Sequence, residues 1–139
     1  MAITLSDEAR RYVAAFEEAT DARARDCLVD DDRVVFVVAM GDMGAAIGPN
    51  GTHVQTLESD FGVDVILVED ADTPAAFVAN ALAPAAVRNV TISESDTTVA
   101  YVEVTDADRG VAIGAEGDRI DLARTLAARH FDIDDVQLA

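Results

Sequence analysis

Apolar residues follow two different spacings along residues 1–70. A stripe at helical spacing comes first, with Thr4 as its expected N-cap, and Val-rich runs typical of strands come later. Gly62 is expected to end the last helix of this stretch. The pattern predicts, in order, a helix that carries Leu5, Ala9, Tyr12, Val13 and Phe16, strands at Cys27–Val29 and Arg33–Met40, a short helix at Asp42–Ile47, a helix that carries Val54, Leu57 and Phe61, and a strand at Val63–Val68.

Residues 71–139 repeat this order of elements. Thr73 and Pro74 suit the start of a helix, and Pro84 marks its end. The elements expected after it are strands at Val87–Ile92 and Thr97–Val104, a short helix at Asp106–Ile113, a helix to about His130, and a strand at Ile133–Leu138.

Each half of the chain therefore has the order α-β-β-α-α-β. This order predicts an α+β fold of two consecutive units, residues 1–70 and 71–139, each a three-stranded sheet covered by helices. The boundary at residues 69–72 is too short for a free linker, so we expect the two units to form one rigid body.

One ten-residue segment occurs twice, at an offset of 66. Residues 42–51 read Asp-Met-Gly-Ala-Ala-Ile-Gly-Pro-Asn-Gly, and residues 108–117 read Asp-Arg-Gly-Val-Ala-Ile-Gly-Ala-Glu-Gly. Six of the ten positions are identical. A single Gly-x-x-Gly tetrapeptide is a weak signal. Here Ile-Gly-x-x-Gly occurs twice, each time after a predicted strand and before a predicted amphipathic helix, so the signal is strong.

A Gly-x-x-Gly turn between two helices suits the binding of a phosphate-bearing strand. Glycines let two backbones pass closely because no Cβ atoms intervene. The helix that follows presents unpaired N–H groups and its positive dipole end beside the loop. KH domains use a loop of this kind to hold about four nucleotides of single-stranded RNA, with the bases against an apolar groove. The candidate RNA-binding residues are Gly48, Pro49, Asn50, Gly51 and His53 in the first unit and Gly114, Ala115, Glu116, Gly117 and Arg119 in the second.

The chain resembles the archaeal NusA-like transcription factors, which consist of two type II KH domains. The resemblance covers the whole chain and rests on the double Ile-Gly-x-x-Gly and on residues 37–44, 77–85 and 128–133. It implies RNA binding linked to transcription elongation or termination. KH loops often carry Lys or Arg between the glycines, whereas the pairs here are Pro49-Asn50 and Ala115-Glu116. Because Glu116 would repel a phosphate, we expect the first loop to be the main RNA contact.

Simpler interpretations exist for the same residues. Both loops could be plain helix–helix turns whose duplication serves folding alone. Arg119 could meet a phosphate or be a solvated surface residue, and His53 could stack on a base or be an exposed helix residue. Cys27 has apolar neighbours and is expected to be a small core residue. Packing rather than base stacking is expected of Phe36, Phe61, Phe77 and Phe131.

The large excess of acidic residues indicates the kind of environment in which the protein works. The chain carries 27 acidic and 10 basic residues, a net charge of −17, and every basic residue is Arg. Half of the residues are hydrophobic, so a folded core is expected. A folded, Asp-rich chain without Lys suggests an intracellular protein from a high-salt environment, where screening removes most self-repulsion. The alternative is an ordinary acidic protein from a low-salt cytoplasm.

Several function classes are disfavoured. Because Cys27 is the only cysteine, an internal disulfide and a Cys-rich zinc site are excluded, and neither metal nor cofactor is expected. The sequence has no Walker A lysine, no dinucleotide fingerprint and no convincing nucleophile–base set, so we expect a non-enzyme with no catalytic residues.

Apolar runs and charge also bear on location and partners. No apolar run approaches the roughly 18 residues of a membrane span, and no signal-peptide core is found. A soluble cytoplasmic protein with neither membrane nor DNA as a partner is therefore expected. The competing function is a protein-interaction module that docks on RNA polymerase with weak or no RNA affinity. The net charge and the loop acids favour this alternative, while the intact glycines disfavour it.

Overall fold

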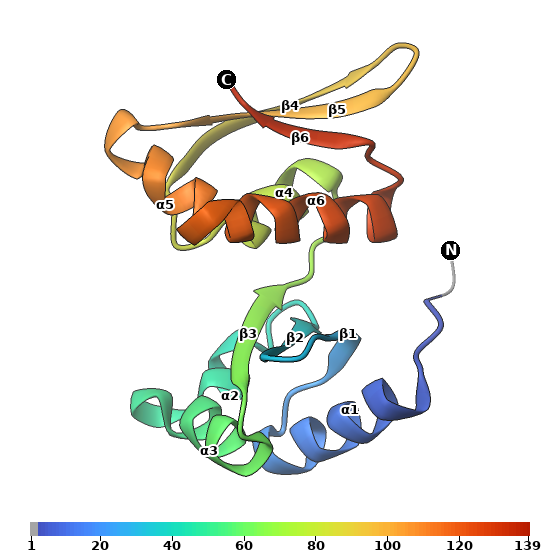
Figure 1. Ribbon diagram of the computed structural model, residues 1–139, viewed down its shortest axis with the longest axis vertical. Helices are drawn as coiled ribbons and strands as arrows, with labels where there is room; N and C mark the ends of the chain where they lie inside the picture. The colour runs from blue at the N-terminus through green and yellow to red at the C-terminus, as the bar shows by residue number, and fades with distance from the viewer. Residues whose placement is uncertain (1–2) are drawn as a thin grey trace. The chain divides into compact units, whose positions relative to one another are not determined.

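The computed structural model describes residues 3–139, which form two compact units, one ending at Asp70 and the other running from Ala71 to Ala139. Each unit is a three-stranded sheet with helices packed on it, and the order α-β-β-α-α-β holds in both (Figure 1). The predicted fold class is therefore confirmed. Within the described part of the chain, no helix is long and apolar enough to cross a membrane.

The first unit, blue to green in Figure 1, places its glycine loop in a crossover connection. Strand β1 pairs antiparallel with β2, and β2 pairs parallel with β3. Parallel neighbours need a crossover between them, and α2 and α3 form it. The elements are α1 (Asp7–Thr20), β1 (Ala24–Val29), β2 (Arg33–Val38), α2 (Met43–Ile47), α3 (Thr52–Phe61) and β3 (Asp64–Glu69).

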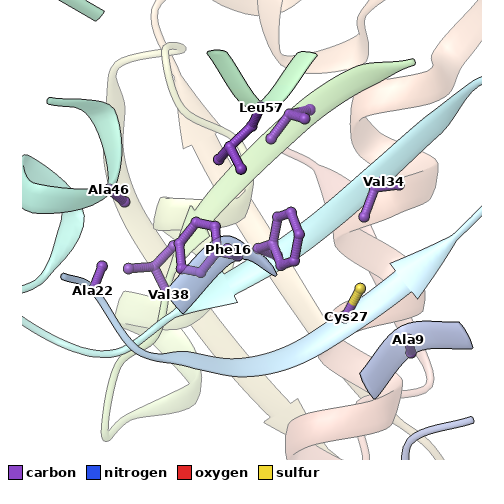
Figure 2. Packing of buried hydrophobic residues seen from close by; sticks show 10 residues of the cluster. Ala9, Phe16, Ala22, Cys27, Val34, Val38, Ala46 and Leu57 are labelled. Atoms are coloured by element: carbon purple, nitrogen blue, oxygen red, sulfur yellow. The ribbon is translucent and has the colours of Figure 1, made fainter. Parts of the chain in front are cut away.

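The core of this unit lies where the helices meet one face of the sheet (Figure 2). Phe16 of α1 stacks on Phe36 of β2 with ring centroids 4.5 Å apart, and both side chains are fully buried. Phe61 of α3 contacts Phe36 at 6.4 Å and meets the ring of Tyr12 edge-on at 4.8 Å. These contacts hold α1 and α3 on the sheet, and α3 is the helix that follows the glycine loop.

Cys27 of β1 belongs to the same buried cluster, as its apolar neighbours predict (Figure 2). Burial raises the pKa of its thiol to about 12, and the negative charges of Asp26 and Glu8 add to the effect. The cysteine is therefore a packing residue that keeps its proton at neutral pH.

The second unit, yellow-green to red in Figure 1, has the same topology. Strands β4 and β5 are antiparallel, β5 and β6 are parallel, and α4 packs on α6 and on β4. Phe77 of α4 is fully buried and contacts the ring of Phe131 at 5.3 Å, so the predicted packing role of these phenylalanines is confirmed. The elements are α4 (Pro74–Ala81), β4 (Val87–Glu94), β5 (Thr98–Val104), α5 (Arg109–Ile113), α6 (Asp118–Phe131) and β6 (Asp135–Leu138).

Three details of the predicted elements are wrong. The N-cap of α1 is Ser6 rather than Thr4, because the Ser6 hydroxyl accepts a hydrogen bond from the N–H of Ala9 at 3.1 Å. The strand predicted at Cys27–Val29 begins at Ala24, because its pairing with β2 continues across a β-bulge. The helix predicted at Asp106–Ile113 is a 3₁₀ turn, Asp106–Asp108, followed by α5. Other bounds differ from the prediction by one or two residues.

Candidate nucleic-acid interface

Both glycine loops lie between two helices, as predicted. Helix α2 leads through a 3₁₀ turn at Pro49–Gly51 into α3, and α5 leads through Ala115–Gly117 into α6. The N–H of the second glycine donates to the carbonyl of the first in each loop, from Gly51 to Gly48 at 3.1 Å and from Gly117 to Gly114 at 3.2 Å. The two loops therefore use the same hydrogen bond to close the turn.

The backbone angles of the two loops agree to within 6°. Gly48 has φ 77° and ψ 170°, and Gly114 has φ 80° and ψ 176°. Asn50 and Glu116 are left-handed, at φ 57° and 56°. Because the pairs Pro49-Asn50 and Ala115-Glu116 share no residue, the flanking segments rather than the pair set this shape.

One aspartate, at the same position of the repeat in each unit, anchors the start of the short helix before the loop. Asp42 accepts a hydrogen bond from the backbone N–H of Arg23 at 3.0 Å, just before β1. Asp108 accepts one from the N–H of Ala86 at 2.7 Å, just before β4. Each short helix is thus tied to the edge strand of its own sheet, which explains why the repeated segment begins with Asp in both copies.

The helices after the loops begin without a side-chain cap. Gly51 is the N-cap of α3 and Gly117 is the N-cap of α6, and neither helix start has a side-chain cap hydrogen bond. First-turn N–H groups at such a helix start favour an anion. The surroundings differ, because the first turn of α6 carries Asp118 and Asp121 while the first turn of α3 carries no acidic residue.

His53 and Arg119 both bond to the short helix before their loop. The carbonyl of Ala45 in α2 lies 2.7 Å from Nδ1 of His53, so that nitrogen donates. Arg119 donates from Nη1 to the carbonyl of Val111 in α5. Both side chains are half-buried and make a bond within the protein, so each has a structural role whether or not it also meets solvent or RNA. Direct RNA contact by either side chain stays a prediction.

Apolar side chains stand exposed beside both loops. Ile47 at the end of α2 is 41% exposed, and Ile113 at the end of α5 is 39% exposed. Val111, on the same short helix as Ile113, is 37% exposed. Protein cores normally bury Ile and Val, so the matched exposed isoleucine beside each loop provides a surface against which a base can lie.

In the second unit, α5, the loop, α6 and β6 enclose a groove of about 490 Å³. Ile113 and Ile120 contribute apolar walls, and Gln137 of β6 contributes an amide. The other lining residues are Arg109, Glu116, Gly117, Asp121, Arg124 and Leu138. Two arginines face two acids, so the groove lining has no net charge.

Both arginines of this groove already have protein partners. Arg109 donates to the main-chain oxygen of Ala139 at 2.8 Å. Arg124 pairs with Asp121 at 2.8 Å and with Asp135 at 3.0 Å. A hydrogen bond from Gln137 lowers the pKa of Asp135, and the Val136 N–H and Arg124 lower it further. These arginines can still donate to a ligand through free N–H groups, but their charge is largely compensated within the groove.

Sequence reasoning named the ten loop residues but missed most of the groove. Arg109, Arg124 and Gln137 lie on three separate elements, and nothing in their spacing shows that these elements meet. Ile113 had a signal, because isoleucine precedes the first glycine in both copies of the repeat.

Two glycine loops in matching crossovers, each on an α-β-β-α-α-β unit, define a tandem KH-domain protein. A family model described as KH domain matches residues 9–72, and one described as NusA-like second KH domain matches residues 74–139. The chain belongs to the NusA family of transcription termination proteins, because it matches members of that family along its whole length.

Two of these relatives come from Halobacterium salinarum and Halococcus morrhuae. The chain is 65% identical over 138 residues to the probable transcription termination protein NusA of Halobacterium salinarum, covering 99% of both chains. It is 61% identical over 139 residues to the protein of that name from Halococcus morrhuae, covering 100% of both. The crystal structure of APE1850 has a TM-score of 0.84 at 26% identity, covering 97% of this chain and 100% of that one.

Proposed function

We propose that this NusA-family chain binds single-stranded RNA through its Gly-x-x-Gly loops during transcription elongation or termination. The observation that carries the proposal is the recurrence of one loop shape in both units, to within 6°, with unrelated residues between the glycines. A shape retained while its sequence differs is expected of a surface that serves a ligand. The relatives' name, transcription termination protein, points to the same process.

The geometry supports a division of labour between backbone and side chains. A phosphate lies against the glycine backbone and the uncapped start of α3 or α6, where N–H groups and the helix dipole favour negative charge. The bases then lie against the exposed Ile47 or Ile113. At about four nucleotides per unit, each loop reads a short single-stranded segment rather than a duplex.

The first loop is the stronger candidate contact. Asn50 offers an amide at the position where the second loop carries Glu116, and both residues are left-handed. The second loop adds Asp118 and Asp121 in the first turn of α6. A carboxylate about 4 Å from a phosphate costs roughly 1 kcal/mol even in water, so these acids weaken the second contact.

Association should depend only weakly on salt. With ten arginines and a net charge of −17, the chain can neutralise few phosphates, so counterion release contributes little affinity. Close backbone approach and base contacts are short-ranged and are screened less than charge pairs over longer distances. The slope of log K against log salt concentration is therefore shallow, or inverted where screening relieves protein–RNA repulsion.

A reciprocal exchange tests the proposal. Asn50→Glu gives the first loop the side chain of the second, and Glu116→Asn does the reverse, at positions with nearly equal φ. Binding of a fluorescent random-sequence RNA of about ten nucleotides, two units at four each, is measured at molar salt. Asn50→Glu should weaken binding and Glu116→Asn should strengthen it, each by less than the roughly fivefold that an unscreened ~1 kcal/mol would give, because molar salt screens the repulsion. Ser59→Ala, on the exposed surface of α3, is the neutral control.

The outcomes separate the candidate functions. Equal effects of both exchanges would overturn the ranking of the loops. RNA binding that ignores both exchanges would move the activity away from the glycine loops. The net charge of −17 favours a second candidate, a module that docks on RNA polymerase. That function predicts weak or no RNA binding by the wild-type chain and retention of purified polymerase by the immobilised chain.

A further inference from the structure

His53 and Arg119 occupy equivalent positions in the two units, in the first turn of the helix after each glycine loop. They are 66 residues apart, and so are the carbonyls that they contact, at Ala45 and Val111. An imidazole and a guanidinium differ in size, shape and charge. Both nevertheless link the helix after the loop to the helix before it, so the link rather than the residue type is common to the two units. We call this link the loop clamp.

The loop clamp serves a carbonyl that its helix leaves without a partner. The N–H that would bond Ala45 in a continuing helix belongs to residue 49, which is Pro49 and has none. In the second unit the chain departs from helical geometry at Gly114, with ψ 176°. The side chains of His53 and Arg119 replace the missing helical donor.

The residue of the loop clamp also lies directly over the first glycine. A Cβ on Gly48 would come within 2.5 Å of Cγ of His53. A Cβ on Gly114 would meet the carboxylate of Asp118 first, and would also come within 2.8 Å of the backbone nitrogen of Arg119 and 2.9 Å of its Cβ. The first glycine thus lies under the start of the following helix, against His53 in the first unit and against Asp118 and Arg119 in the second, and the two helices cannot separate without breaking the link.

We propose that His53 and Arg119 are positioning residues for RNA binding, each holding its glycine loop in the shape against which a phosphate lies. The inference rests on the proposed function. The loops need such a restraint, because both contain a non-glycine residue at positive φ and a first glycine in a region that is nearly glycine-only. Without the loop clamp, these angles would relax toward commoner values and the binding surface would be lost.

Substitutions at His53 separate the link from the ring. His53→Ala removes the donor, whereas His53→Asn places an amide N–H close to where Nδ1 lies but removes the ring. Ser59→Ala serves again as the control on α3. Amide hydrogen exchange at Gly48, Asn50 and Gly51 reports loop opening, and the random-sequence RNA probe reports affinity. All measurements use the full chain at molar salt.

His53→Ala should speed exchange at these three amides and weaken RNA binding about fivefold, the usual worth of one hydrogen bond. His53→Asn should restore both. In the second unit, Arg119→Met should loosen the loop while keeping the stem of the side chain, and Arg119→His should retain the link, because histidine already makes it in the first unit.

Each failure has its own signature. Unchanged loop exchange in His53→Ala would overturn the loop clamp. Faster exchange with unchanged affinity would show a purely structural link and overturn the positioning role. If His53→Asn restores slow loop exchange but not RNA affinity, the positioning role is overturned and His53 is assigned to direct stacking on a base. If the wild-type chain does not bind the RNA, the proposed function fails, whereas the exchange measurements still report whether the clamp exists.

Discussion

The two glycines of each loop should differ in their tolerance of a methyl group. Gly48 combines φ 77° and ψ 170° with the ring of His53 within 2.5 Å of an added Cβ. That backbone region costs a non-glycine residue about 1–3 kcal/mol, and displacing His53 costs about 1 kcal/mol for its hydrogen bond. Gly48→Ala should therefore destabilise the chain by about 2–4 kcal/mol.

Gly51→Ala should be milder. Gly51 lies in the left-handed helical region, at φ 73° and ψ 16°, where a side chain costs about 1–2 kcal/mol. An added Cβ there would meet only the Gln55 amide, at 4.0 Å. Gly44, near the start of α2, has no positive φ, and an added Cβ would meet nothing within 4 Å. Gly44→Ala should be neutral or stabilise by up to about 1 kcal/mol.

Urea denaturation at molar salt measures these differences, with circular dichroism following the helices. Equal slopes against urea would show that the variants unfold from comparably compact states. The reasoning predicts the order Gly48→Ala, then Gly51→Ala, then Gly44→Ala, from most to least destabilised. A Gly48→Ala variant no less stable than Gly51→Ala would refute the role assigned to the His53 contact. A destabilised Gly44→Ala would show that glycine in this segment serves some other purpose.

Four further predictions concern the whole chain. Cys27 should resist a thiol reagent at pH 8 until denaturant is added, because its pKa is raised to about 12 by burial; rapid labelling of the folded chain would contradict this. The lowered pKa of Asp135 means that its carboxylate contributes stability above the usual carboxyl pKa of about 3.9, and that this contribution is lost as pH falls through the lower folded-state value. Asp135→Asn should therefore flatten the acid limb of the stability curve, and an unchanged limb would count against it. The melting temperature should rise from low to molar salt as the −17 charge is screened, and a flat or falling trend would argue against salt adaptation. Finally, NMR relaxation should show one tumbling time for residues 3–70 and 71–139; two distinct times would mean that the short boundary is a flexible linker.

The order of elements could be predicted from sequence because two independent signals agree. Apolar spacing gives the type of each element, and the repeat gives the same order twice, so an error in one half is exposed by the other. The exact ends of the helices and strands were harder to predict. Thr4 and Ser6 are both hydroxyl residues at the start of α1, and only the hydrogen bond to Ala9 distinguishes the cap. The first half of β1 was not predicted, because it contains the charged residues Arg25 and Asp26, which are not typical of strands.

The loops were visible in the sequence, but what holds them was not. Glycine spacing identifies the turn, and Glu116 already distinguishes the two copies. The loop clamp was hidden because alignment of the repeat places His53 opposite Arg119, a pairing that looks like ordinary surface divergence. Each side chain bonds to a main-chain carbonyl eight residues earlier, at Ala45 and Val111. A sequence does not show which backbone carbonyl a side chain will reach. The groove arginines became neighbours only when α5, α6 and β6 were placed together.

The equal shape of the two loops bears on how a duplicated gene can diversify. The anchoring aspartates, the glycines and the loop clamp determine the path of the main chain. The residues between the glycines, 49–50 and 115–116, can therefore be exchanged without changing that path. Position 50 or 116 asks only for a residue that tolerates a left-handed backbone, as Asn50 and Glu116 both do here. Each copy can therefore change its preference through two codons, at no more than the small cost of placing the new side chain in a left-handed conformation. Differences at these four positions among related chains would then record changes of ligand rather than changes of structure.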